Sequence, residues 1–212
     1  AAAVALPWDR PISAAVMRVR TSSSNDVALA VSRLGSTPIV AAVAAVLVGV
    51  AWPRCRRLAV AVLVLALARP LVEFVLKELV GRDRPDGNRL VPGRGPSFPS
   101  GHPFATAASW GFVPLVVALY TRRRAVWWAA TIAVWTLAVL VAASRVWLGV
   151  HWTSDAVGGL LLAALGLLGA ERLIAAAHGG AGCGGRQSAV SDASAPGWTV
   201  VPDDHRTPRR TP

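Results

Sequence analysis

Charged residues are scarce in this sequence. They make up 16% of its 212 residues, whereas soluble domains average about 25%. Lysine is nearly absent, because Lys77 is the only one among the 22 Lys+Arg residues. Hydrophobic residues, in contrast, reach 54%. The shortage of charge argues against an ordinary soluble domain and favours a membrane protein.

Long uncharged runs distinguish a membrane protein from a soluble protein with a large core. A membrane helix needs about 20 mostly apolar residues, and three runs are this long: 34–53, 95–121 and 125–144. Two further candidates are an interrupted stretch that contains Arg69 and Glu73, and a shorter run that ends before Glu171. We therefore predict an all-α membrane helix bundle with five transmembrane helices, at about residues 35–53, 58–80, 102–120, 125–143 and 155–175.

The positive charges are concentrated in the short links between these helices. Two arginine clusters occupy the first and third links, and in a five-helix arrangement both fall on the same side. Because positive residues in short loops mark the cytoplasmic side, residues 81–101 and 144–154 should face outward. The outer side nevertheless carries cations of its own, which need a separate reason: Arg82, Arg84, Arg89, Arg94 and Arg145. This distribution accounts for the net charge of +11 without a nucleic-acid partner.

The two ends of the chain differ from its middle. Residues 1–34 contain no spanning run, and mixed apolar and charged residues there indicate a segment lying on the outer membrane surface. Residues 35–176 form the predicted membrane domain. Residues 177–212 are rich in Gly, Ser, Ala, Pro and Arg, and should form a disordered cytoplasmic tail.

Three short motifs fall at the outer ends of the predicted helices. The first is Lys77-x6-Arg84-Pro85, the second runs from Pro99 to His102 as PSGH, and the third runs from Ser144 to Asp155 as SRVWLGVHWTSD. Although about 80 residues separate the first motif from the last, the bundle should bring all three to the same membrane face.

The first feature of these motifs is a set of phosphate-binding groups. Lys77, Arg84 and Arg145 supply three cations, and the arginine fork matches phosphate oxygens bidentately. Ser100 and Gly101 precede a helix whose first turn contains a proline, a residue favoured at that place. Free NH groups at a helix start bind anions, and glycine allows close backbone approach. The motifs therefore predict an oxyanion site.

The second feature is a pair of imidazoles. His151 and Asp155 are four residues apart, a spacing that would let the carboxylate bond one ring nitrogen and leave the other free to attack. His102 lies at the edge of the oxyanion site, where it could protonate a leaving oxygen. A metal is disfavoured, because Asp155 is the one carboxylate in the set. These groups together indicate phosphoryl transfer through a histidine, with no cofactor.

The three motifs, in this order, resemble the signature of the type 2 phosphatidic acid phosphatase superfamily, the lipid phosphate phosphatases related to vanadium haloperoxidases. The resemblance covers residues 35–175. It implies that His151 forms a phosphohistidine, that Asp155 orients it and that His102 is the general acid. It also implies that the remaining motif residues hold the phosphate: Lys77, Arg84, Arg145, Ser100 and Gly101.

The same resemblance sets expectations for architecture and substrate. Membrane members typically have six helices with the site on the outer face, so the first family helix is expected to be absent from this chain. Five membrane helices do not suit the soluble haloperoxidase fold. The expected substrate is a membrane lipid phosphate or pyrophosphate, of phosphatidate, phosphatidylglycerol phosphate or polyprenyl pyrophosphate type. A phosphotransferase using the same phosphohistidine and a non-catalytic lipid-binding relative are the alternatives. An Ala-, Val-, Arg- and Gly-rich composition suggests a bacterial source.

A further charge pattern lies within the second predicted helix. Arg69, Glu73 and Lys77 are spaced four apart and so share one helix face. Charges inside a membrane span are costly and usually face the bundle interior. Glu73 is expected either to compensate Arg69 or to hold Lys77 in place.

Overall fold

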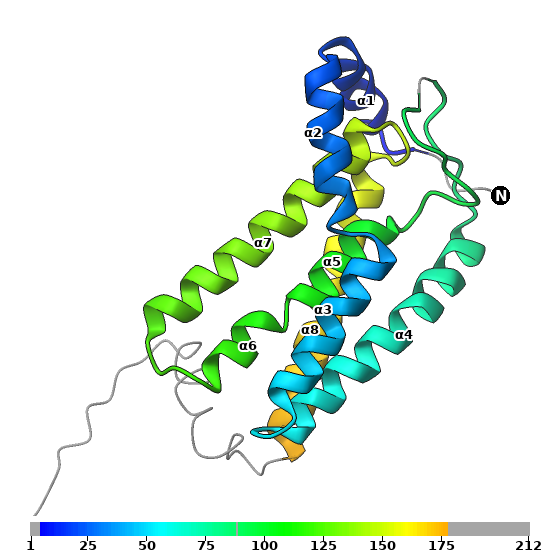
Figure 1. The fold of residues 1–212 in the computed structure, drawn as a ribbon. Helices are drawn as coiled ribbons and strands as arrows, with labels where there is room; N and C mark the ends of the chain where they lie inside the picture. Colours follow the sequence, from blue (N-terminus) through cyan, green and yellow to red (C-terminus); the bar gives the residue numbers. More distant parts are fainter. Residues whose placement is uncertain (1–4, 88, 178–212) are drawn as a thin grey trace, which may run out of the picture.

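The computed structural model describes residues 5–87 and 89–177. In this part of the chain all the regular secondary structure is helical (Figure 1). The all-α prediction is thereby confirmed, whereas the predicted tail lies outside the described residues from position 178 onward. The helices are α1 Asp9–Arg18, α2 Ser22–Arg33, α3 Thr37–Ala51, α4 Arg56–Val80, α5 Gly101–Trp110, α6 Val113–Ala118, α7 Arg124–Trp147 and α8 Thr153–Ala177.

Three of these helices, α4, α7 and α8, are long and apolar enough to cross a membrane. If α2 and α3 are counted as one broken span, they make a fourth, because together they are also long and apolar enough, although the chain bends by 41° between them. Large apolar side chains on α4 point outward, among them Leu67, Leu71 and Phe74, each more than half exposed. Such a surface suits contact with lipid rather than with water.

The count of five continuous spans is not confirmed. The run predicted as one helix over 102–120 is divided into α5 and α6. Pro114 lies in the first turn of α6, and a proline has no NH for the preceding turn, so a helix tends to restart there. The helix observed in the predicted span 35–53 is also shorter than expected, because α3 contains only 15 residues.

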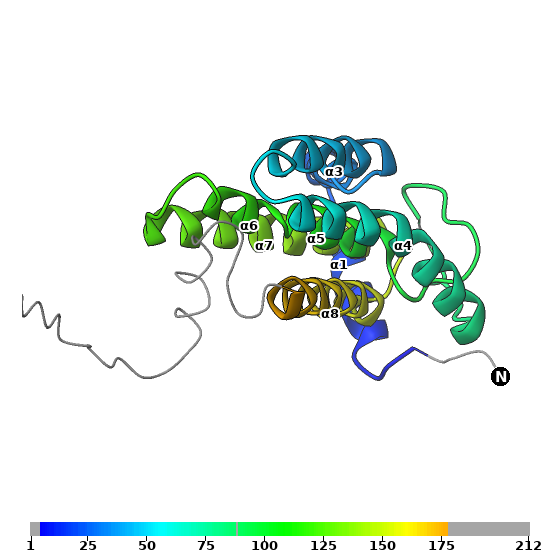
Figure 2. The same ribbon diagram turned by 90° about the horizontal axis from the view of Figure 1, so that it is seen from below.

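Helix α5 is the centre of the bundle. It packs against α3, α4, α7 and α8, and Figure 2 shows α3 and α8 on opposite sides of it. Seven of its ten residues are buried, in agreement with a helix that is apolar on nearly all faces. The PSGH motif therefore leads directly into the central helix, since Ser100 is its N-cap and Gly101 its first residue.

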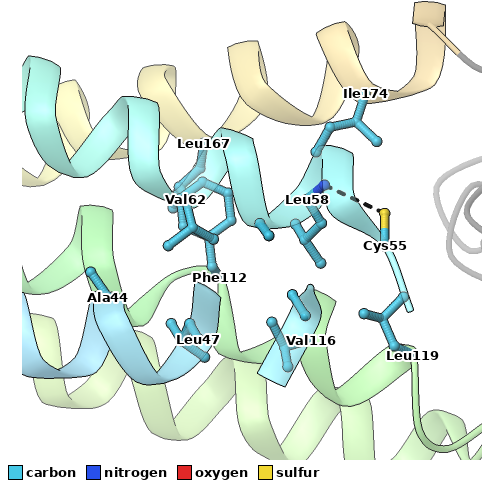
Figure 3. Packing of buried hydrophobic residues seen from close by; sticks show 12 residues of the cluster. Ala44, Leu47, Cys55, Leu58, Val62, Phe112, Val116, Leu119, Leu167 and Ile174 are labelled. Carbon is cyan, nitrogen blue, oxygen red and sulfur yellow. Dashed lines mark hydrogen bonds between the residues drawn. The ribbon is translucent and has the colours of Figure 1, made fainter. Parts of the chain in front are cut away.

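The main apolar core lies away from the motifs, where α6 meets α3, α4 and α8. Phe112 is completely buried there, in one cluster with Leu58 and Val62 of α4 and Leu167 of α8 (Figure 3). A buried aromatic side chain contributes roughly 1.5–3 kcal/mol relative to its exposed state. This packing fixes the bundle at the end opposite the motifs.

The two ends of the bundle carry different loops (Figure 1). The links α3–α4 and α6–α7, which bear the arginine clusters, lie together at one end. The 81–100 loop and the α7–α8 turn lie at the other end, beside α1 and α2. The predicted gathering of the three motifs at one end of the bundle is therefore confirmed.

Candidate active site

Helix α4 brings the first motif to the site. Its last turn contains Lys77, and its C-cap is Gly81, whose φ of 56° gives the left-handed conformation that glycine adopts without strain. The side chain of Glu73 accepts from Lys77 Nζ through Oε1 at 2.6 Å and from Arg69 Nη1 through Oε2 at 2.6 Å. Both pairings expected for Glu73 therefore occur together.

The 81–100 loop places Arg84. Its guanidinium donates to carbonyl oxygens of Gly95 at 3.0 Å, Arg94 at 2.9 Å and Val150 at 2.7 Å. The Nη1 atom also lies 3.2 Å from Nε2 of His151. The loop and the α7–α8 turn thus hold the arginine fork against the predicted nucleophile.

His151 lies in the turn before α8, with 3% of its surface exposed. Its Nδ1 is 2.9 Å from the carbonyl oxygen of Ser97. Because a carbonyl can only accept a hydrogen bond, Nδ1 carries the hydrogen and Nε2 keeps its lone pair. Burial, with added repulsion from Arg84 and Arg145, lowers the pKa of His151 to about 4 against the opposing attraction of Asp155. The ring is therefore neutral near pH 7, and its nucleophilic atom is Nε2, whose lone pair faces Arg84 Nη1 at 3.2 Å.

Asp155 does not make the direct hydrogen bond to His151 that the four-residue spacing predicted. Its Oδ2 lies 3.7 Å from Nδ1, and Ser97 takes the place of the expected acceptor. The carboxylate instead accepts from the Trp152 backbone NH at 2.9 Å and from Arg82 at 2.6 Å. The cause is the 81–100 loop, which inserts a backbone carbonyl beside the ring. Asp155 remains next to the imidazole as a buried negative charge.

The PSGH motif forms the start of α5. Ser100 is the N-cap, and its NH donates to the backbone oxygen of Asp155 at 3.1 Å, which joins α5 to the start of α8. His102 and Pro103 lie in the first helical turn, where the missing NH of proline is tolerated. Gly101 faces the Glu73 carboxylate so closely that a β-carbon there would collide with it.

Arg145 lies in the last turn of α7, on the third side of the site. Its Nη1 donates to Ser32 of α2 at 2.7 Å, and the residue is 8% exposed. Among the described residues, neither Arg145 Nε nor the Ser100 hydroxyl has a hydrogen-bond partner, although both atoms are buried. Buried polar atoms are rarely left unpaired, so these two fit a site that receives a polar ligand.

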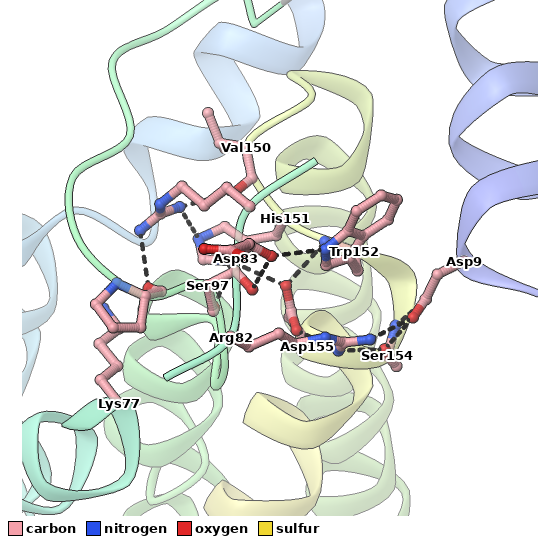
Figure 4. A network of polar contacts seen from close by, with 12 residues as sticks. Asp9, Lys77, Arg82, Asp83, Ser97, Val150, His151, Trp152, Ser154 and Asp155 are labelled. Carbon is pink, nitrogen blue, oxygen red and sulfur yellow. Dashed lines mark hydrogen bonds and ion pairs between the residues drawn. The ribbon is translucent and has the colours of Figure 1, made fainter. Parts of the chain in front are cut away.

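Figure 4 shows the arrangement around His151. Lys77 lies on one side of the ring, and Asp155, Arg82, Ser154 and Asp9 follow one another on the other side. The structure thus brings the predicted residues to one end of the bundle, with cations and the helix start around His151. This arrangement can hold a phosphate group against a neutral imidazole.

Four residues of this region were missed by sequence reasoning. Ser97 and Ser32 act through a backbone oxygen and a single hydroxyl, for which no sequence pattern exists. Arg82 is one of the cations on the predicted outer side that needed a separate reason. The excess of positive charge on that side was therefore a signal that could have pointed to Arg82. Asp9 lies in the N-terminal segment, 68 residues before the first motif, and gave no signal.

Comparison with known proteins finds chains that are similar in sequence and in fold. The chain is 31% identical over 169 residues to phosphatidylglycerophosphatase B of Bacillus subtilis (strain 168), covering 76% of this chain and 78% of the relative. The crystal structure of a transmembrane PAP2 type phosphatidylglycerolphosphate phosphatase from Bacillus subtilis superposes with a TM-score of 0.69 at 29% identity, covering 78% of this chain and 83% of that one. The fold is also that of Aquifex aeolicus LpxE, with a TM-score of 0.62 at 17% identity over 79% of this chain and 96% of the other.

The family model of the PAP2 superfamily matches residues 57–177, which contain all three motifs. The resemblance that the motifs indicated is thereby confirmed. The chain belongs to the PAP2 superfamily, and it is an integral membrane lipid phosphatase.

Proposed function

We propose that this chain hydrolyses the phosphate monoester of a membrane lipid, with phosphatidylglycerophosphate as the first candidate, through a phosphohistidine on His151. The observation that carries the proposal is the state of His151: a buried neutral ring, with Nδ1–H on the Ser97 carbonyl and Nε2 beside Arg84. The named activity of the Bacillus subtilis relative supports the choice of lipid.

The first chemical step is attack by His151 Nε2 on the phosphorus atom. An N–P bond forms while the bond from phosphorus to the lipid alcohol oxygen breaks. Burial, with added repulsion from Arg145, lowers the pKa of His102 to about 3, so His102 serves as the acid once the negative charge of the bound phosphate has raised this pKa and restored the proton. His102 then gives this proton to the leaving oxygen, and the lipid leaves as a neutral alcohol. Water then attacks the phosphohistidine, the N–P bond breaks, and the second product is inorganic phosphate. His102, deprotonated by the first step, recovers its proton from this water.

Stabilisation of the transferring phosphoryl group falls to the surrounding cations. Arg84, Arg145 and Lys77 approach from three different elements, and preorganised charges of this kind are worth most where water is excluded. The Ser100 hydroxyl and the NH groups at the start of α5 add donors for the oxygens. Because protein cations balance the phosphate charge, we propose that the reaction needs no metal ion.

The arginine clusters support one orientation of the chain in the membrane. The links that contain Arg54 and Arg122–Arg124 lie at the end opposite the site (Figure 1), and such clusters favour the cytoplasmic side. We propose that the site faces outward, that α1 and α2 lie on the outer surface over it, and that the tail is cytoplasmic. Labelling of single cysteines placed at Asp26 and Arg122 in intact cells tests this orientation: the outer position should react with an impermeant reagent and the inner one should not.

Phosphate release from purified protein tests the activity. Phosphatidylglycerophosphate, phosphatidate and a polyprenyl pyrophosphate are supplied in mixed micelles, with and without a chelator. We expect release from at least one lipid, unchanged by chelation and abolished in His151→Ala. Persistent release by His151→Ala would refute the proposed nucleophile, and loss of activity on chelation would refute metal independence.

A further inference from the structure

Asp9 is an unexpected member of the site region. It lies at the start of α1, far in sequence from the motifs, and has no exposed surface. A buried carboxylate is costly unless it is paired and hydrogen-bonded. Asp9 accepts from the Ser154 backbone NH at 2.9 Å, from the Ser154 hydroxyl at 2.6 Å and from Arg82 at 2.7 Å. Apart from the backbone NH of Leu6, which donates to Oδ2 at 2.9 Å, the partners of Asp9 belong to α8 and to the loop after α4.

Arg82 connects Asp9 to the site (Figure 4). Its Nη2 donates to Asp9, while Nη1 donates to Asp155 Oδ1 at 2.6 Å and to the Ser154 hydroxyl at 2.7 Å. The arginine side chain is 5% exposed, and both carboxylates are fully buried. The guanidinium of Arg82 is thus shared between two buried carboxylates. Its bond to either carboxylate limits how far the guanidinium can turn toward the other carboxylate.

This sharing determines the position of Asp155. Arg82 holds its Oδ1, and the Trp152 backbone NH holds Oδ2 at 2.9 Å. Oδ2 consequently stays 3.7 Å from Nδ1 of His151, close enough to attract the positive charge that the ring gains when Nε2 bonds to phosphorus. A guanidinium released by Asp9 would turn toward Asp155, neutralise it and draw it away from the ring.

Asp9 also determines where α8 begins. Free NH groups at a helix start need acceptors, and Asp9 supplies one to Ser154 from another part of the chain. His151 lies three residues before Ser154 in sequence. Movement of this helix start would move the nucleophile.

We propose that Asp9 and Arg82 are positioning residues of the phosphatase, which hold Asp155 and the start of α8 and through them His151. The proposal rests on the function proposed above. It makes the N-terminal helix a required part of the catalytic unit rather than a surface segment beside it. The phosphate-binding cation Lys77 lies on the other side of His151 (Figure 4), so loss of Asp9 should affect turnover and leave substrate binding nearly unchanged.

The test is a comparison of Asp9→Asn with Asp26→Asn in purified full-length protein. Asp26 is exposed on α2, so the same chemical change there serves as the matched control. We expect Asp9→Asn to lower kcat about tenfold, by analogy with the outer partners of metal ligands, whose loss costs about 10- to 100-fold, with KM within about twofold of wild type. Asp26→Asn should retain the wild-type values.

A second comparison uses Asp155→Asn as background. If Asp9 acts through Asp155, adding Asp9→Asn to this variant lowers kcat no further. A wild-type kcat in Asp9→Asn, or a full tenfold loss in both backgrounds, would overturn the proposal. If Asp9→Asn cannot be purified, Ser154→Ala takes its place, because it removes the hydroxyl shared by Asp9 and Arg82. A kcat unchanged in Ser154→Ala would then count against the proposal.

The same experiment separates this inference from the function on which it rests. An inactive wild type on every lipid phosphate would refute the proposed function, and the inference with it. An active wild type with His151-dependent release, together with an Asp9→Asn variant of normal kcat, would overturn the inference alone.

Discussion

Replacing Gly101 with alanine should disturb the site through Glu73. The added methyl group would lie 2.6 Å from Glu73 Cδ and 2.7 Å from Oε2, and closer still to Oε1. A flexible carboxylate would normally move aside. Here each of its oxygens is bound at 2.6 Å, one by Lys77 and the other by Arg69. The collision can be relieved only if Glu73 gives up one of these partners or if the start of α5 shifts.

The size of the effect follows from those contacts. A hydrogen bond that involves a charged group contributes about 1.5–3 kcal/mol, and each 1.4 kcal/mol corresponds to about a factor of ten. If Lys77 is displaced, the transition state loses the free energy of one such hydrogen bond. The value of kcat/KM should then fall by roughly 10- to 150-fold. Folding should survive, because the contact lies at a helix start and not in the main core.

The assay is phosphate release under kcat/KM conditions, with Gly169→Ala as the matched control. Gly169 lies on α8 and has no atom within 4 Å of an added Cβ, so its replacement should leave activity within about twofold. In a Glu73→Ala background the collision is absent, and Gly101→Ala should cause little further loss. Near-normal activity of Gly101→Ala alone would refute the reasoning, and so would an undiminished loss in the Glu73→Ala background.

The remaining predictions concern Lys77, Glu73 and the acid limb of the pH profile. Lys77→Arg should fold and lose most activity in the release assay, because we expect the compact ammonium to fit beside the phosphate where the larger, planar guanidinium does not; near-normal turnover would make the single lysine an accident of composition. Glu73→Gln should lower kcat/KM about tenfold, since a charge-assisted bond to Lys77 is lost, and normal turnover in a folded variant would remove any role in catalysis. His151 must be neutral to attack, and its pKa of about 4 predicts a pH–rate profile that stays level on the acid side until about pH 5 and falls through pH 4. Because this folded-state pKa lies below the unfolded value of about 6.5, the unfolded chain binds the proton more readily, so the contribution of His151 to stability also declines as pH falls from about 6.5 to 4. A loss of activity already centred near pH 6.5 would contradict the assignment.

Much of the fold could be predicted from run length and charge. The uncharged runs identified α7 and α8, and α4 was found despite Arg69 and Glu73, because interior charges are compatible with a span when they pair. The division between α5 and α6 was missed, although Pro114 marked it. In a membrane protein an apolar run does not reveal whether its residues form one helix or two, since both face the same apolar surroundings.

The site could be predicted in composition but less well in contacts. The motif spacings placed Lys77, Arg84, Arg145 and His151 at one end of the bundle, because that depends only on helix ends. The direct Asp155–His151 bond was expected from local spacing and is replaced by the Ser97 carbonyl, which a loop 54 residues away in sequence brings in. Asp9 could not have been found, since only the folded chain brings α1 against the start of α8.

Direct detection of the phosphoenzyme tests the central claim, that His151 is the nucleophile. Purified protein is mixed with a lipid substrate labelled in its phosphate monoester, quenched within the first turnover and digested for mass spectrometry. We predict an acid-labile, base-stable label on the peptide that contains His151, and no label in His151→Ala. Rapid turnover by wild type without any labelled peptide, or a label that persists in His151→Ala, would contradict the account.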